Sequence, residues 1–308
     1  SQLPSPLGGD EDFLADDDES VLLLTPLDEL GLTLHAIGAD AVPASLQIDY
    51  ESLLTAQAID RDQPGSLLRD FNGLLDAIGA EGIEITKANK TPRARFMAEL
   101  NEHLTHSIAL TLKRAQPRSY PNVNGLYLLL RAAGLGRIER DKYLHLDASA
   151  LASWFELNPS EQYFTLLESW LQRVDMGVIG EFSSPHHRPL QQWLFFYTSI
   201  PQEGLPIPGG ARWEDYVYSL PELPMLSLME MFGLIAITQG QPGPNEGWRV
   251  ERIGRTPFGD VLLARLFAYL SSEWEQPLQP ENPFFGHLVP IYRSFFPEWQ
   301  EYLQLPEV

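Results

Sequence analysis

The sequence predicts a mainly helical fold with small β-hairpins: tandem winged-helix modules preceded by an α+β N-terminal segment. Two observations predict it. First, helix, linker, helix and a two-stranded hairpin occur in this order over residues 91–147, which is the order of a helix-turn-helix followed by its wing, and a second copy of the helix and hairpin follows over residues 221–253. Second, the two copies match around the helix end, where Leu130–Leu135 (LRAAGL) aligns with Met229–Leu234 (MEMFGL). In both, a glycine that can turn the chain through positive φ ends the helix.

Five regions are expected along the chain, and each is defined by a change in composition or periodicity. They are an acidic flexible leader (1–20), an N-terminal α+β segment (21–90), a basic first winged helix (91–180), an acidic second winged helix (181–275) and an aromatic, proline-rich C-terminal tail (276–308). The length of 308 residues accommodates two or three domains.

Local patterns predict the elements of the first copy and of the segment before it. Apolar residues at helical spacing predict a helix over 66–78, and IEIT at 83–86 predicts a short strand. Thr91-Pro92 is expected to open a helix that ends near His106. A second helix is expected over 122–133, a hairpin over 135–147, and a helix from the capping box Asn158–Glu161 to about Leu171.

The second copy is expected between residues 221 and 270. Its predicted elements are a helix over Pro221–Phe232, a strand over Leu234–Thr238, a Gly/Pro-rich wing tip, a return strand over Trp248–Ile253 and a helix capped by Thr256-Pro257.

The distribution of charge is the most informative property of the composition. The net charge is −21, but residues 87–142 carry 11 basic and 4 acidic residues, a local net charge of +7. This basic segment coincides with the first predicted helix-turn-helix and wing. Because cationic side chains neutralise phosphates and the second helix of the motif enters the major groove, the coincidence favours duplex DNA as a partner. The predicted nucleic-acid-binding residues are Arg118, Asn122, Asn124, Arg131, Arg137, Arg140 and Lys142.

A different class of function competes with DNA binding. The basic residues could instead pair with the acidic N-terminal segment or with an acidic partner, which would make the protein an interaction scaffold. The second copy supports such a role, because its helix carries Glu222 and Glu230 and no basic residue. Met225, Met229 and Phe232 form a stripe at helical spacing on it, either buried in a core or exposed as an adaptable face for a protein partner or a second copy of the chain.

The sequence offers little for catalysis, cofactors or membranes. Without cysteine, thiolate zinc sites, catalytic thiols and disulfides are excluded. Motifs for nucleophilic serine, phosphate loops and dinucleotides are missing. His103 and His106, beside Glu99 and Glu102, have metal-ligand spacing without a further ligand set, and His186-His187 is expected in a surface loop. We therefore expect a non-enzymatic, cofactor-free cytoplasmic protein with no membrane segment.

Four stretches resemble a family of bacterial proteins. They are PGSLLRDFNGLLDAIG (64–79), SYPNVNGLYLLLRAAGL (119–135), LNPSEQYFTLLESWL (157–171) and FFPEWQEYLQLPE (295–307). They are similar to the region that precedes the conserved domain in the Ri-plasmid third-open-reading-frame-like family. The resemblance covers most of the chain from residue 64 onward, with little from 172 to 250. It implies that the family's small β-rich domain would begin just after Val308, and it transfers no catalytic residue.

Overall fold

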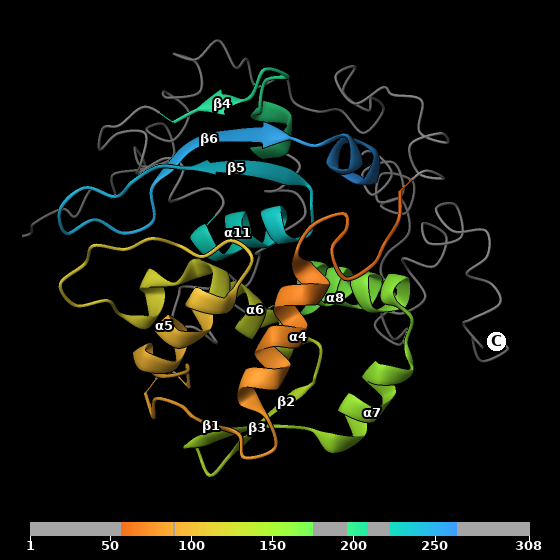
Figure 1. Ribbon diagram of the computed structural model, residues 1–308. Coiled ribbons are helices and arrows are strands. Elements are labelled where there is room, and N and C mark those ends of the chain that lie inside the picture. Colours follow the sequence, from red (N-terminus) through yellow and green to blue (C-terminus); the bar gives the residue numbers. More distant parts are fainter. Residues whose placement is uncertain (1–56, 89, 175–195, 208–221, 264–308) are drawn as a thin grey trace, which may run out of the picture. The chain divides into compact units, whose positions relative to one another are not determined.

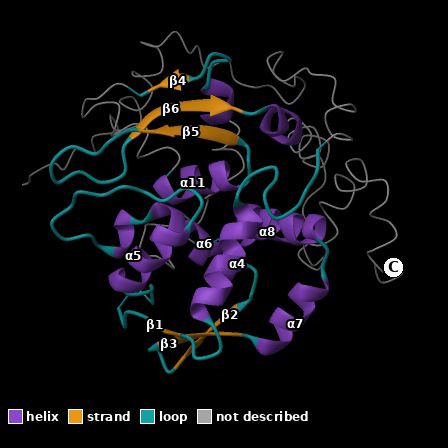
Figure 2. Cartoon of the chain, in the orientation of Figure 1, coloured by secondary structure: helices purple, strands orange, loops and turns teal. Residues whose placement is uncertain are grey.

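The structure is a computed structural model that describes residues 57–88, 90–174, 196–207 and 222–263. The described part is a mixed α/β protein in which helices accompany two small antiparallel three-stranded sheets (Figures 1 and 2). The predicted leader, the C-terminal tail and the His186-His187 loop lie outside the described residues. No helix in the described ranges is long and apolar enough to cross a membrane.

The first sheet has the strand order β1-β3-β2. Its surroundings, in chain order, are α4 (Leu67–Ile78), β1 (Ile83–Glu84), α5 (Ala94–His103), the 3-10 helix η2 (Pro117–Ser119), α6 (Pro121–Ala132), β2 (Gly136–Glu139), β3 (Tyr143–Leu146), α7 (Ala148–Glu156) and α8 (Pro159–Arg173). Helix α4 contacts the sheet at β3, and helix α6 contacts it at β2. Both β1 and β2 pair antiparallel with β3. The predicted boundary at residue 90 therefore falls between strands of one sheet.

The hairpin predicted over 135–147 is confirmed. Lys142 N–H donates to the Glu139 carbonyl at 3.1 Å, and Arg140 and Asp141 between them have φ of 48° and 58°. Positive φ at both central residues is what the tight turns of two-stranded hairpins require. The turn is thus a tip that projects two charged side chains from the end of the sheet.

Alternation of side chains gives the first sheet one apolar and one charged face. Ile83, Leu144 and Ile138 form a row across the three strands, and Leu144 at its centre is fully buried. The next row, Glu84, Tyr143 and Glu139, carries the charges. A two-residue strand such as β1 is stable here because its Ile83 extends the apolar row of a hairpin that already exists.

The helix predicted over 66–78 is confirmed as α4, but the predicted start of the next helix is wrong. Thr91 does not cap that helix. Its N–H and hydroxyl lie 3.3 and 3.1 Å from the Thr86 hydroxyl, and its carbonyl accepts from Thr86 N–H at 2.7 Å. This bridge holds the chain extended, so α5 begins only at Ala94.

The capping box at Asn158 is confirmed. Asn158 Oδ1 accepts from Glu161 N–H at 3.0 Å, and Glu161 Oε2 accepts from Asn158 N–H at 2.8 Å. Two amide groups that a helix start leaves without partners are satisfied in this way. The helix that follows, α8, runs to Arg173, close to the predicted end at Leu171.

The second sheet repeats the first in strand order and in its apolar row. It comprises β4 (Leu205–Pro206), β5 (Ile235–Gln239) and β6 (Val250–Arg255) in the order β4-β6-β5, and α11 (Leu223–Met231) precedes β5. Leu205, Ile253 and Ile237 lie side by side across it. The predicted hairpin is confirmed with strands one or two residues later in the chain, whereas β4 has no counterpart among the predicted strands.

The predicted correspondence of the two helix ends is confirmed bond by bond. Gly134 and Gly233 have φ of 73° and 75°. Leu135 N–H donates to the Leu130 carbonyl at 3.1 Å, and Leu234 N–H donates to the Met229 carbonyl at 2.9 Å. This is the Schellman pattern, which satisfies carbonyls at a helix end while a glycine reverses the chain. After β6, Thr256 Oγ1 accepts from Gly259 N–H at 2.9 Å, which confirms the predicted cap of the helix that begins at 257.

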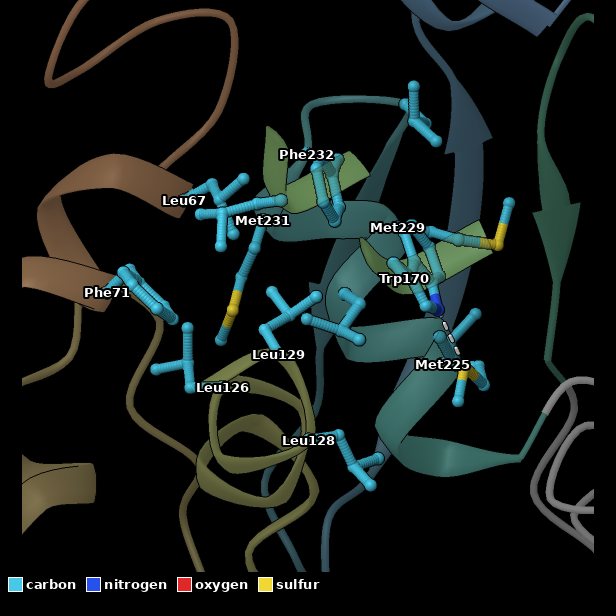
Figure 3. Packing of buried hydrophobic residues seen from close by; sticks show 14 of the residues in the cluster. Leu67, Phe71, Leu126, Leu128, Leu129, Trp170, Met225, Met229, Met231 and Phe232 are labelled. Carbon is cyan, nitrogen blue, oxygen red and sulfur yellow. Dashed lines mark hydrogen bonds between the residues drawn. The ribbon is translucent and has the colours of Figure 1, made fainter. Parts of the chain in front are cut away.

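Helices α6 and α11 pack directly on each other and form the centre of the core. Every residue of α6 from Pro121 to Leu130 is buried, and so is every residue of α11 from Pro224 to Met231. Figure 3 shows α4, α6, α8 and α11 contributing side chains to one cluster. On α8, the Trp170 ring stacks on Phe232 with centroids 4.8 Å apart. A helix buried on all sides supports a core and leaves no solvated face.

Close approach of α6 and α11 depends on Gly125. A Cβ at this residue would lie 2.8 Å from Leu228 Cγ and 3.1 Å from the Pro224 carbonyl oxygen. Gly73 in α4 is a matched control, because a Cβ there meets nothing within 4 Å.

We predict opposite effects of the same substitution at these two glycines. Gly125→Ala overpacks the α6–α11 contact and should lower the free energy of unfolding by about 1–3 kcal/mol. Gly73→Ala should raise it by about 0.5–1 kcal/mol, because alanine restricts the unfolded chain and favours helix. Urea unfolding of both variants measures the difference, and an equal gain in both would contradict the packing described.

Candidate nucleic-acid interface

The two asparagines predicted to read bases are structural residues. Asn122 and Asn124 are 1% and 2% exposed. The Asn122 amide donates to Asn101 Oδ1 at 2.7 Å and to the His106 carbonyl at 3.2 Å, and the Asn124 amide donates to the Pro117 carbonyl at 3.0 Å. Both amides tie the chain before α6 to the helix. Because α11 and neighbouring helices cover α6, neither asparagine is exposed to a duplex.

Arg131, in the last turn of α6, is also part of the packing. Its guanidinium donates to the Tyr127 hydroxyl at 3.1 Å, and the Tyr127 hydroxyl donates to the Lys90 carbonyl. Burial raises the pKa of Tyr127. Arg131 is half-buried in this chain of contacts, which joins α6 to the segment before α5.

The hairpin of β2 and β3 (136–146), which was predicted as the first wing and keeps that name below, carries exposed charges of both signs. Arg137, Arg140 and Lys142 are all exposed, as predicted for residues that reach a ligand. Lys142 Nζ lies 4.0 Å from Glu84 and 4.9 Å from the centre of the Tyr143 ring. Arg137 and Arg140 form no ion pair with any described residue.

Acidic residues at the same end of the sheet neutralise part of the wing. Glu84 Oε2 also forms an ion pair with Arg93 Nε at 2.9 Å, and Asp141 Oδ1 in the turn forms one with Lys90 Nζ at 2.8 Å. The hydrogen bond from Lys90 lowers the pKa of Asp141. Within the described residues, the ion pairs of the basic segment all join residues between 84 and 142, and none of them involves residues 57–70.

Arg118 lies apart from the wing, at the other end of α6. It is exposed in η2, immediately before the helix, and Lys113 and Arg114 are exposed in the loop that leads to it. With 12 residues at about 1.5 Å each, α6 separates this loop from the wing by roughly 18 Å. The structure thus divides the predicted basic face into two clusters, one at each end of a buried helix.

The sequence prediction missed Lys113 and Arg114 as site residues and missed what holds their loop. The loop contacts the segment between β5 and β6 (240–249), which was predicted as the second wing, keeps that name below, and lies about 130 residues away in the chain. Thr111 N–H donates to the Glu246 carbonyl at 3.1 Å, and Lys113 N–H donates to Asn245 Oδ1 at 3.2 Å. The sequence shows that the loop is basic. No local sequence pattern, however, predicts a contact between segments so far apart in the chain.

Met225, Met229 and Phe232 belong to the core. Their exposed fractions are 2% or less, and the Trp170 indole N–H donates to Met225 Sδ at 2.8 Å (Figure 3). Of the two interpretations of this stripe, the structure supports the buried core. None of the three is exposed to a partner.

Two buried carboxylates belong to α4 and α11. Asp70 Oδ1 accepts from the N–H and hydroxyl of Thr105 at 2.9 and 2.8 Å, whereas its buried Oδ2 has no hydrogen-bond partner among the described residues. Glu230 Oε1 accepts from Ile237 N–H at 3.0 Å. Burial raises the pKa of Glu230, nearby His106 opposes this shift and Asp70 adds to it.

His103 and His106 belong to no metal centre among the described residues, and His186-His187 lies outside them. His103 Nδ1 lies 2.7 Å from the Glu99 carbonyl oxygen, one turn earlier in α5. No group of three histidine, aspartate or glutamate side chains in the described ranges is placed to hold a metal ion.

Comparison with known proteins assigns no family. The chain matches no protein-family model, and no curated protein or solved structure matches it significantly. The resemblance of its four stretches to the Ri-plasmid family therefore stays a prediction.

The buried carboxylate predicts a pH dependence of stability. Because the fold raises the pKa of Glu230, the folded protein binds a proton more tightly than the unfolded chain, and stability should increase as pH falls through the raised pKa toward the ordinary value of about 4.3. Glu230→Gln keeps an acceptor for Ile237 N–H and removes the charge. It should be more stable than the parent at pH 7–8 and show a flatter stability profile between pH 8 and 5. Melting temperatures of the parent and the variant, measured between pH 5 and 8, test this prediction.

The exposed Glu81→Gln substitution serves as the control for the loss of one carboxylate. It should leave the profile of the parent protein unchanged. A Glu230→Gln variant that is less stable than the parent at pH 7–8 would contradict the prediction.

Proposed function

We propose that the protein is a tandem winged-helix protein. In the first module, α4, β1, α5, α6, β2 and β3 supply three helices, three strands and one wing in the winged-helix order. The second module is supported by the same strand order, the same apolar row and the same Schellman end between helix and hairpin. In this assignment α6 and α11 hold the place of the recognition helix in their modules.

Its role is that of a non-enzymatic adaptor that binds other proteins. The observation that carries this proposal is the burial of α6 and α11 against each other. A recognition helix reads DNA by placing side chains in the major groove, and a helix without an exposed face has none to place there. The modules therefore act through their remaining surfaces.

Phe155 provides a test of the adaptor role. It is 62% exposed on α7 and is the one large hydrophobic side chain of the described residues that is exposed. Exposed aromatic residues anchor protein interfaces. The tagged protein, isolated from cells that express it naturally, should retain a partner in near-stoichiometric amount, and Phe155→Asp should reduce that amount at least about tenfold, since anchors contribute about 2 kcal/mol or more.

Ser153→Asp, also exposed on α7, is the matched control for the added charge and should retain the partner. Both variants should keep the melting temperature of the parent. Absence of any partner, together with enrichment of one motif from a random duplex pool, would refute the adaptor role.

Duplex DNA binding by the first wing is the second candidate function. It is favoured by Arg137 and Arg140, which are exposed and form no ion pair with the described residues. If the wing binds phosphates, the parent protein should show a slope of log affinity against log salt near −2.7 from about three phosphate contacts, and changing Arg137, Arg140 and Lys142 together to Glu should abolish binding. Fluorescence anisotropy of a labelled duplex across a salt series measures both quantities.

A further inference from the structure

The loop before α6 is a basic surface without neighbouring acidic residues in its own sequence. Residues 107–126 contain Lys113, Arg114 and Arg118 and no aspartate or glutamate. All three side chains are exposed, and none forms an ion pair with another described residue. The first wing differs, because Glu84, Glu139 and Asp141 lie among its basic residues. Of the two clusters at the ends of α6, the loop therefore has the more uniform positive charge.

The second wing fixes this loop through its main chain. The Thr111 hydroxyl donates to the Gly243 carbonyl, and Glu246 N–H donates to the Thr111 hydroxyl at 3.0 Å. Together with the bonds from Thr111 N–H and Lys113 N–H, they attach the loop to the wing tip at consecutive points. The two loops run side by side in Figure 1. Ordering of the loop before a ligand arrives reduces the entropy that binding would otherwise cost.

The acidic residue at the contact is already paired. Glu246 interacts with Arg249 at 3.2 Å and accepts from Gly243 N–H within the second wing. Its charge is thus satisfied inside the wing that holds the loop. The charged side chains that the loop itself exposes are Lys113, Arg114 and Arg118, which are all positive.

We propose that Lys113, Arg114 and Arg118, held by the second wing, form a binding surface for the phosphate backbone of duplex nucleic acid. The surface has no exposed large apolar residue, and an acidic protein partner would need such an anchor at the centre of its interface. It also has no exposed aromatic ring, on which the bases of a single strand would stack. Charge without apolar or aromatic contact fits the backbone of a duplex, which is bound without regard to sequence.

This surface is independent of the proposed adaptor role and differs from the predicted interface. Of the residues predicted from the sequence, it retains Arg118 alone. The surface requires both modules, because the second wing holds the basic loop in place. The second wing itself supplies no phosphate contact in this proposal. Nucleic-acid binding by this protein is then non-specific and salt-sensitive, and it leaves α7 and its exposed Phe155 accessible.

The test compares the same change of charge at the two ends of α6. Lys113, Arg114 and Arg118 are changed together to Glu in one variant, and Arg137, Arg140 and Lys142 in the other. With about three phosphate contacts, the parent protein should bind a labelled duplex with a log–log salt slope near −2.7, so binding should weaken about 40-fold between 50 and 200 mM salt. The loop variant should lose this binding, and the wing variant should keep it within about twofold.

A further variant tests the part played by the second wing. Thr111→Val keeps every charge and removes the hydroxyl that contacts Gly243 and Glu246. It should weaken duplex binding several-fold with the salt slope unchanged, because the same number of phosphates is neutralised by a less ordered loop. An unchanged affinity would refute the proposal that the second wing holds the basic loop for binding.

Three other outcomes would overturn the proposal. They are no duplex binding by the parent at 50 mM salt, loss of binding in the wing variant instead of the loop variant, and competition by an acidic polypeptide that is stronger than competition by unlabelled duplex. The first leaves the adaptor role standing, and the second transfers DNA binding to the first wing. Equal melting temperatures of the exposed-charge variants show that folding is intact.

Discussion

The contact between α6 and α11 determines what the rest of the molecule can do. Gly125 allows the helices to approach until Leu228 and the Pro224 carbonyl fill the space that a side chain would take. Burial on this scale is the main favourable contribution to folding, and it uses the faces of both helices. As a result, the asparagines at the start of α6 bind main-chain groups and the methionines of α11 fill a core. The surfaces left for partners are the wings, the loop before α6 and α7.

Each of the two helix–hairpin segments, α6 with β2–β3 and α11 with β5–β6, has the same geometry where its helix ends and its hairpin begins. Gly134 and Gly233 adopt positive φ, and the following leucine donates back to the helix. This geometry delivers the next strand onto the helix, with its apolar row facing inward. The same row, Ile83–Leu144–Ile138 in one sheet and Leu205–Ile253–Ile237 in the other, then recruits a two-residue strand from an earlier part of the chain. A repeated local signal thus produces a repeated sheet.

The pairing of charged residues, unlike the helix ends, depends on which segments lie close together in space. The basic segment is continuous in sequence, but α6 divides it into two clusters with different surroundings. At the wing, Glu84 and Asp141 offset Lys142, Arg93 and Lys90. At the loop, the second wing supplies main-chain and amide contacts, and its Glu246 pairs with Arg249. The basic side chains at the wing therefore lie among acidic ones, whereas the loop itself carries basic side chains and no acidic one.

The sequence by itself determined the local features: α4, α6, both hairpins, the capping box at Asn158, the cap at Thr256 and the glycine that ends each helix. These depend on periodicity, φ and hydrogen bonds within a few residues, which neighbouring side chains encode. Only the tertiary structure decided that β1 and β4 complete the sheets, that Thr91 bridges to Thr86 instead of capping α5, that Asn122 and Asn124 are buried, and that a distant wing holds Lys113. Each of these depends on contacts between segments far apart in the chain, and no local pattern specifies which surfaces will be buried against each other.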